Sequence, residues 1–278
     1  MSAAVATDHP VTSATAHRGR VTQGHVLRSE WTKLWSLRST RWSLLAAVVA
    51  MAGLGILIAA VQMSRWSQLD AREIARFDSI DIGAAGYHLA QLAVGVLGVL
   101  VIAGEYTTGM IRSSFMAVPR RLPVLWAKLG VFCSVTFVSM LVSTLVSFFA
   151  VQAIVQQHGR QHALGDPHAL RVVVGTALFL TVLGALAVGI GALVRNTAGG
   201  IALFVFLLFV LPGITAILPQ STSDAINPYL PLNAGTAVAT STFDPGPHLA
   251  PWTGFAVFCG YAVVIIAAAA VGLRRRDA

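Results

Sequence analysis

The chain has 278 residues, of which 56% are hydrophobic and only 11% are charged, and its mean hydropathy is +0.74. Soluble domains carry about 25% charged residues, so this composition excludes an ordinary soluble protein. The formal net charge of +8 would suit nucleic-acid binding, but the basic residues lie between long apolar stretches, where they indicate membrane orientation instead. We therefore expect a membrane protein that binds no nucleic acid.

Two segments precede the first long apolar stretch. Residues 1–24 are rich in Ala, Thr, His and Arg, lack the apolar core of a signal peptide, and are predicted to be a disordered cytoplasmic tail. Over 25–41, apolar residues recur at helical spacing among basic ones: Leu27, Trp31, Leu34 and Trp35. This pattern predicts an amphipathic helix in the cytoplasmic interface of the lipid bilayer. Such a helix either anchors the first span or also contacts a partner, and the sequence leaves both open.

Six stretches contain no Asp, Glu, Lys or Arg and are predominantly apolar. They cover residues 43–63, 84–103, 129–154, 172–194, 198–218 and 252–273. At 1.5 Å per residue, roughly 20 helical residues cross the ~30 Å hydrocarbon core, and each stretch reaches that length. The sequence therefore predicts an all-α polytopic protein, with six transmembrane helices in one membrane domain over 25–278. Pro212 is expected to kink the fifth helix.

The basic residues between these stretches are distributed unevenly. If the N-terminus is cytoplasmic, most of the 19 Lys and Arg residues are also cytoplasmic, and only five are external: Arg65, Arg72, Arg76, Arg160 and Arg171. Positive residues favour the cytoplasmic side, so both termini are predicted to be cytoplasmic. The two cysteines, Cys133 and Cys259, lie within apolar stretches and are interpreted as core residues.

The connection after the second stretch is the best functional candidate. Glu105 lies where the second helix is predicted to leave the bilayer, and Arg112 follows about two helical turns later. Between them, Thr107 and Gly109 are residue types suited to capping and turning a short helix. The segment is therefore predicted to form a small docking helix outside the membrane.

The sequence excludes one energy source within the chain. A phosphate-binding P-loop ends in Lys followed by Ser or Thr, but the only two lysines are followed by Leu34 and Leu129. ATP and magnesium, if used, must bind a separate subunit. An ion-coupled secondary transporter or channel without an ATPase partner is the alternative, although the spans offer only His88 as an ionisable group.

An enzyme is a third class to weigh. Serines and threonines recur along the third stretch, but at spacings that helix packing explains without a catalytic base. His158, His162 and His168 could bind a metal ion, yet only Asp166 accompanies them, so a solvated loop is the preferred interpretation. No catalytic, cofactor-binding or metal residue is assigned to the chain.

Three segments resemble a known family. They are Glu-Trp-Thr-Lys-Leu-Trp-Ser-Leu-Arg-Ser-Thr at 30–40, Gly-Glu-Tyr-Thr-Thr-Gly-Met-Ile-Arg at 104–112 and Tyr-Leu-Pro-Leu-Asn-Ala-Gly at 229–235. In their order and placement, these segments are similar to those of permease subunits of type 2 ATP-binding-cassette exporters, particularly actinobacterial ones. The likeness covers nearly the whole chain after residue 24.

The resemblance implies the pore-forming subunit of an ATP-driven exporter in a bacterial plasma membrane. Such a permease pairs with a second copy of itself, as a homodimer, or with a related permease, and docks onto separate ATPase subunits. The resemblance implies two sets of contact residues in this sequence. The ATPase-coupling segment would comprise Glu105, Tyr106, Thr107, Gly109 and Arg112, and the interfacial helix would contribute Glu30, Trp31 and Lys33.

Overall fold

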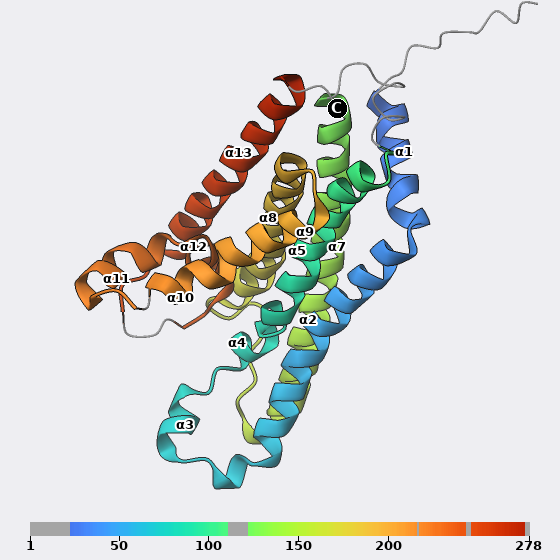
Figure 1. Cartoon of the computed structure of the whole chain (residues 1–278). Helices are drawn as coiled ribbons and strands as arrows, with labels where there is room; N and C mark the ends of the chain where they lie inside the picture. The colour runs from blue at the N-terminus through green and yellow to red at the C-terminus, as the bar shows by residue number, and fades with distance from the viewer. Residues whose placement is uncertain (1–22, 111–121, 216, 243–245, 276–278) are drawn as a thin grey trace, which may run out of the picture.

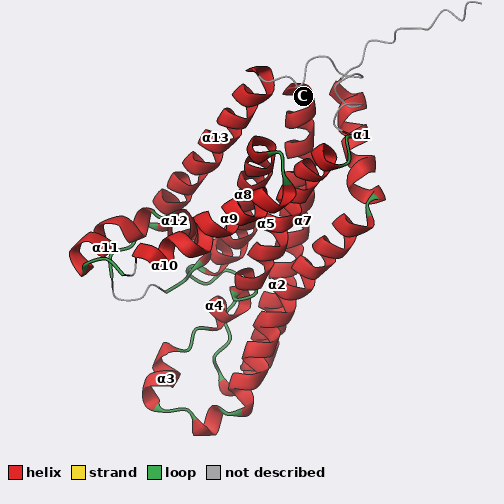
Figure 2. Ribbon diagram, in the orientation of Figure 1, coloured by secondary structure: helices red, strands yellow, loops and turns green. Residues whose placement is uncertain are grey.

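The computed structural model describes residues 23–110, 122–215, 217–242 and 246–275, and every regular element among them is helical (Figure 1, Figure 2). The α-helices are α1 (Gln23–Ser36), α2 (Arg38–Ser64), α3 (Ala71–Arg76), α4 (Ser79–Ala84), α5 (Tyr87–Thr107), α7 (Leu122–Val155), α8 (Ala169–Val194), α9 (Thr197–Val205), α10 (Leu211–Thr215), α11 (Gln220–Ile226), α12 (Pro231–Thr236) and α13 (Pro251–Arg275). The predicted tail lies outside the described residues except for Gln23 and Gly24, which begin α1.

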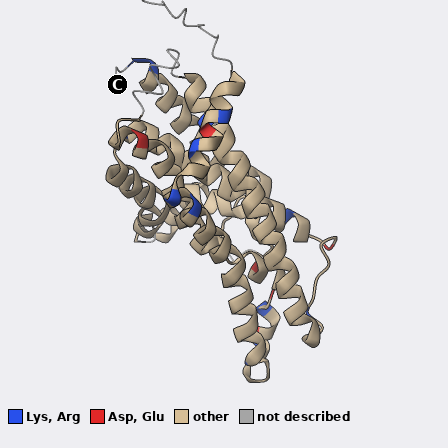
Figure 3. Cartoon of the chain, turned by 90° about the vertical axis from the view of Figure 1, so that its right-hand side faces the viewer, with Lys and Arg blue, Asp and Glu red and all other residues tan. Residues whose placement is uncertain are grey.

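The prediction of an all-α protein with six membrane-spanning helices is confirmed. Within the described residues, six segments are long and apolar enough to cross a bilayer: Arg38–Ser64, Ser79–Thr107, Leu122–His158, Ala169–Val194, Thr197–Thr215 and Pro251–Arg275. Most of the helical surface carries neither acidic nor basic residues (Figure 3). Five segments extend beyond the charge-free stretches, because a helix continues into the boundary region, where polar side chains reach water.

The two ends of the bundle differ in what they carry. The helix α1, the last turns of α13 and the end of α5 lie at one end, which we call the α1 end (Figure 1). The short helix α3 and the connection between α7 and α8 lie towards the opposite end (Figure 1). An even number of membrane crossings places the segments before the first span and after the last span on the same side of the membrane.

The helix α8 forms the centre of the fold. Within its most apolar window 72% of the residues are buried, against 17% in the fifth span and 22% in α13. The helices α5, α7, α9 and α13 all pack against α8. Its side chains Phe179, Leu183 and Leu186 are fully buried in the main hydrophobic cluster. The fifth span and α13 therefore lie on the periphery of the bundle.

Close backbone approach ties α5 to α8. A β-carbon added at Gly98 of α5 would lie 2.7 Å from the carbonyl oxygen of Gly184 in α8 and 2.9 Å from the β-carbon of Ala187. A backbone oxygen at that distance cannot move aside as a flexible side chain would. Small residues at such crossings let two helices pack without an intervening layer of side chains, so α5 and α8 form a tightly joined pair.

This contact gives a testable prediction for stability. Gly98→Ala places a methyl group against the α8 backbone and should lower the melting temperature of the detergent-solubilised protein. Gly104→Ala, in the same helix, is the matched control, because an added β-carbon there meets nothing within 4 Å. Alanine favours a helix by about 1 kcal/mol over glycine, so the control should melt at or above the wild-type temperature. Equal melting temperatures for the two variants would contradict the close approach.

The predicted amphipathic helix over 25–41 is interrupted. The helix α1 ends at Ser36, Leu37 is extended with φ −81° and ψ 120°, and α2 begins at Arg38. The Ser36 hydroxyl donates to the carbonyl of Lys33 in the last turn of α1. The break lets the chain change direction between α1 and the first span, and no Gly or Pro at this point announced it.

The fifth span contains an irregular turn next to Pro212, the residue at which the sequence predicted a kink. Its first part, α9, passes through the π-helical turn Phe206–Val210 into the short helix α10. Pro212 lies two residues after this turn and has no backbone N–H to continue the regular ladder. A wider turn is one of the recognised ways in which a helix accommodates such a defect.

Polar contacts close the bundle opposite the α1 end. Asp81 of α4 accepts hydrogen bonds from the backbone N–H of Ser241 at 2.6 Å and from the hydroxyl of Thr242 at 2.7 Å. Arg171, at the start of α8, donates to the carbonyl of Thr240 at 2.9 Å. The segment 237–242 is thus held by both the second span and α8.

Candidate functional site

Of the five residues predicted to form the coupling segment, the structure describes four. Glu105 is buried in the last turn of α5, Tyr106 is half-buried, and Thr107 is exposed at the end of the helix. Gly109 has φ 73°, in the left-handed region that favours glycine. Arg112 lies outside the described residues, as does the rest of the predicted docking helix.

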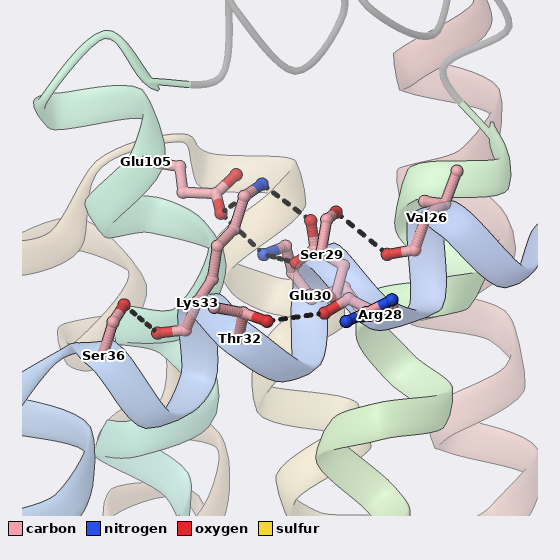
Figure 4. Close-up of polar contacts among 9 residues, drawn as sticks. Val26, Arg28, Ser29, Glu30, Thr32, Lys33, Ser36 and Glu105 are labelled. Carbon is pink, nitrogen blue, oxygen red and sulfur yellow. Dashed lines mark hydrogen bonds and ion pairs between the residues drawn. The ribbon is translucent and has the colours of Figure 1, made fainter. Parts of the chain in front are cut away.

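The interfacial-helix residues occupy two different faces of α1. Glu30 is buried and Lys33 half-buried, and Figure 4 shows both side chains directed towards Glu105 of α5. Trp31, by contrast, is 50% exposed and lies 5.9 Å from Trp35, measured between ring centroids. One face of α1 therefore meets the bundle, whereas the other presents tryptophans outward.

Four charged side chains meet where α1 crosses α5 and α7, and we refer to Glu30, Lys33, Glu105 and Lys128 as the charge cluster. The amine of Lys128, on α7, lies 2.6 Å from Glu30 Oε2 and 2.8 Å from Glu105 Oε1. The amine of Lys33 lies 2.7 Å from Glu30 Oε1 and 3.4 Å from Glu105 Oε1. Two carboxylates and two amines thus alternate, so the cluster is formally neutral.

The members of the cluster differ in exposure. The side chains of Glu30 and Lys128 are 3% and 4% exposed and that of Glu105 is 9% exposed, whereas Lys33 remains 26% exposed. Removing charges from water is costly, and a buried pair offsets this only when every charge has a partner. Lys128 bridges the two carboxylates, and without it they would face each other with only the more exposed Lys33 between them.

Burial and pairing act on Glu30 and Lys33 in opposite directions. Burial alone would raise the pKa of Glu30, but the charge and hydrogen bond of Lys128, supported by Lys33, hold this pKa below its ordinary value of 4.5. Burial alone would lower the pKa of Lys33, but its hydrogen bond to Glu30 and the charge of Glu105 raise it above 10.5. Both groups are therefore charged at neutral pH.

A small cavity adjoins the cluster. It measures about 20 Å³ and is lined by all four charged residues together with apolar side chains that include Leu34 and Val131. This volume holds about one water molecule. Glu105 Oε2 is buried and has no hydrogen-bond partner among the described residues.

Apolar contacts complete the docking of α1. Val26 packs against Val124 and Ala127 of α7 in a cluster separate from the main core. Leu34, one turn beyond Glu30, joins the main cluster. The buried face of α1 is therefore apolar at both ends and charged in the middle, so the charges fix the register of an otherwise non-directional contact.

Lys128 is a site residue that the sequence motifs did not indicate. It was counted only as a positive charge at the border of the third span. One signal was available: the chain contains 19 Lys and Arg residues, yet Lys33 and Lys128 are its only lysines, and the structure places both in the charge cluster. Among the described residues no three His, Cys, Asp or Glu side chains are grouped so that they could hold a metal ion; His162 pairs with Asp166 at 3.2 Å, and His158 lies beside Trp66.

Comparison with known families identifies the class of protein. Residues 36–278 match the family described as ABC-2 family transporter protein. This match covers most of the chain, so the protein belongs to the ABC-2 family of membrane transporter subunits, as the resemblance in the sequence implied. Permeases of this family are not ATPases themselves and generally pair with ABC ATPases. Comparison with curated proteins returns no match.

Removing Lys128 tests the energetic role of the cluster. Lys128→Met should lower the free energy of unfolding by about 3–5 kcal/mol, because it leaves two buried carboxylates without their shared amine. Arg28→Met is the matched control: Arg28 is a basic residue exposed on α1, the helix to which Lys128 binds through Glu30, and its loss should change stability by less than about 0.5 kcal/mol. Denaturant unfolding in mixed micelles measures both. A Lys128→Met protein as stable as wild type would show that the cluster contributes nothing.

The pKa shifts predict how α1 docking depends on pH. The lowered pKa of Glu30 gives stability that is present above pH ~4.5 and lost as the pH falls through that lowered pKa. The raised pKa of Lys33 gives stability that is present below pH ~10.5 and lost as the pH rises through that raised pKa. A fluorescent label at exposed position 32 in a Cys-free background should report constant docking between these limits, with release in acid.

A Glu30→Gln variant provides the control for this titration, because its acid transition should be weakened or absent. A transition centred near pH 6–7 in the unaltered chain would instead indicate control by a histidine and would contradict the assignment to Glu30.

Proposed function

We propose that this chain forms the translocation pathway of an ATP-driven exporter, works as a dimer, and is driven by a separate ATPase that docks on the connection between α5 and α7. The observation that carries the proposal is the position of Glu105. It is the last buried residue of α5 before that connection, and its carboxylate binds Lys128 on the other side of the same connection, 2.8 Å away. The family membership argues against the alternative of an ion-coupled carrier.

The contacts explain how force would enter the membrane part. The connection leaves α5 through an exposed turn at Thr107 to Gly109 and returns at Leu122, the first residue of α7. Lys128 ties the two flanking helices to each other and to α1 through Glu30. A displacement of the connection would therefore move α1, α5 and α7 as one unit, because separating any of them would leave a buried charge without its partner.

The proposal assigns a second role to α1. Its outward face carries Leu27, Trp31 and Trp35, all at least 40% exposed, with Arg28 among them. Tryptophans and arginines of this arrangement suit the headgroup region of a bilayer. In this proposal the α1 end faces the cytoplasm of a bacterium, both termini are cytoplasmic, and α1 lies along the inner leaflet while its charged face grips the bundle.

Co-purification with a separate ABC ATPase tests the coupling role. Gly109→Val should insert normally but weaken co-purification and transport-linked ATP hydrolysis, because valine resists φ 73° although an added β-carbon meets no neighbour within 4 Å. Glu105→Gln should have the same effect while keeping the shape of the side chain. Gly104→Ala is the matched control, since it lies in the same helix in open space, and should retain wild-type values.

Three results would contradict the proposal. One is wild-type co-purification and ATPase rates in both Gly109→Val and Glu105→Gln, measured in membranes matched for permease level. Another is ATP hydrolysis by the purified chain alone. A third is transport driven by an ion gradient in proteoliposomes that contain only this chain, which would revive the carrier alternative.

A further inference from the structure

A second set of contacts joins the end of α5 to helices outside the charge cluster, and Arg195 lies at its centre. Arg195 follows the last residue of α8 and caps that helix, with its backbone N–H donating to the carbonyl of Gly191 at 2.9 Å. Its φ is 57°, in the left-handed region. Glycine is the usual residue at such a helix end because a side chain there costs conformational energy. The backbone position alone therefore does not explain an arginine.

The side chain of Arg195 joins two other helices. Its guanidinium carbon lies 5.3 Å from the centre of the Tyr106 ring, within the range of a cation–π contact. Its Nη2 donates to the carbonyl of Gly272, in the last turn of α13, at 3.3 Å. Nearby, the hydroxyls of Thr107 and Thr197 lie 3.4 Å apart, linking the end of α5 to the start of α9. Arg195 thus brings together the ends of α5, α8 and α13.

The chemistry of arginine suits this position. The guanidinium is planar, so it can stack on an aromatic face and donate hydrogen bonds at its edge at the same time. Its positive charge also lies near the C-terminal ends of α8 and α13, where the carbonyl groups at a helix end favour a cation. Lysine would retain the charge but not the combination of stacking and directed donation.

Consecutive residues of α5 therefore hold different helices. Glu105 binds Lys128 of α7 and Lys33 of α1, whereas Tyr106 contacts Arg195, which binds α13. The helix α13 is among the least buried spans, and at its end only Ala269 and Leu273 are buried in the main hydrophobic cluster. We propose that Arg195 is a positioning residue that transmits displacement of the coupling segment from α5 to α13. This inference rests on the proposed function, because it requires an ATPase that moves the coupling segment.

The test uses the permease–ATPase complex in nanodiscs and hydrogen–deuterium exchange with and without ATP, magnesium and vanadate. In the unaltered complex, nucleotide should change deuterium uptake both in α1 (Gln23–Ser36) and in the end of α13 (residues 266–275). Arg195→Gly keeps the left-handed helix cap and relieves its backbone, so it should fold with unchanged or higher thermal stability. It should nevertheless lose the nucleotide response of 266–275 and keep that of α1.

Two further variants sharpen the result. Arg274→Gln removes an exposed charge from the same end of α13 and should keep both nucleotide responses. Arg195→Lys should give a reduced response of 266–275. Arg195→Gly with a full response at 266–275, or an unaltered complex in which α1 responds and 266–275 does not, would overturn the role of Arg195. Absence of a nucleotide response in α1 as well, or failure to isolate any complex, would instead count against the proposed function.

Discussion

The pairing of two buried carboxylates with two lysine amines decides how α1 is held on the bundle. Apolar contacts such as Val26 against Val124 would tolerate sliding or rotation, because the hydrophobic effect is not directional. Charges buried to less than 10% exposure do not, since a shift of one turn would leave Glu30 or Lys128 without a partner. Replacing such a network with apolar residues often stabilises a protein, so the cluster is better explained by fixing one arrangement than by adding stability.

The central pair of helices, α5 and α8, connects the charge cluster to polar contacts at the opposite end of the bundle. The two helices approach closely at Gly98 and Gly184, where no side chain separates their backbones. At the α1 end the pair carries Glu105 and Arg195. At the opposite end, α4, which belongs to the same candidate span as α5, contributes Asp81, while α8 contributes Arg171, and both bind the segment 237–242. Packed interiors transmit displacement because they deform little, so a tilt of this pair would change the geometry of the polar contacts at both ends.

The sequence was sufficient for the spans but not for the faces of α1. Six apolar stretches of this length are stable only in a lipid bilayer. There the backbone must form its hydrogen bonds internally, so each stretch is a helix. In α1 the apolar series Leu27, Trp31, Leu34 and Trp35 predicted a side that faces the bilayer interface, whereas in the structure Leu34 is buried against the bundle together with Glu30, and the other three are exposed. A charged residue on a helix normally indicates the solvated side. The opposite assignment becomes evident only when the charges of α5 and α7 are placed beside it.

The same limitation applies to Lys128 and Arg195. Each is a single basic residue at a span border, which is where the orientation rule expects basic residues, so sequence pattern gave no reason to look for a partner. Their partners are Glu30, from 98 positions earlier in the chain, and the carbonyl of Gly272, from 77 positions later. Contacts of this sequence separation depend on how helices are arranged around α8, which the hydropathy of each span does not encode.

Differences in burial suggest which helices can change position. The helix α8 is buried over most of its length, whereas the fifth span and α13 are largely exposed on the bundle surface, and weakly packed elements move at lower cost than central ones. In the proposed mechanism, a force applied beyond Gly109 acts through two sets of contacts at the end of α5. Glu105 contacts α1 and α7, and Tyr106 is connected through Arg195 to α13. The first set consists of buried ion pairs and is stiff. The second consists of one cation–π contact and one hydrogen bond beside the apolar packing of Ala269 and Leu273, so α13 can change its angle to the central pair without leaving a buried charge unpaired.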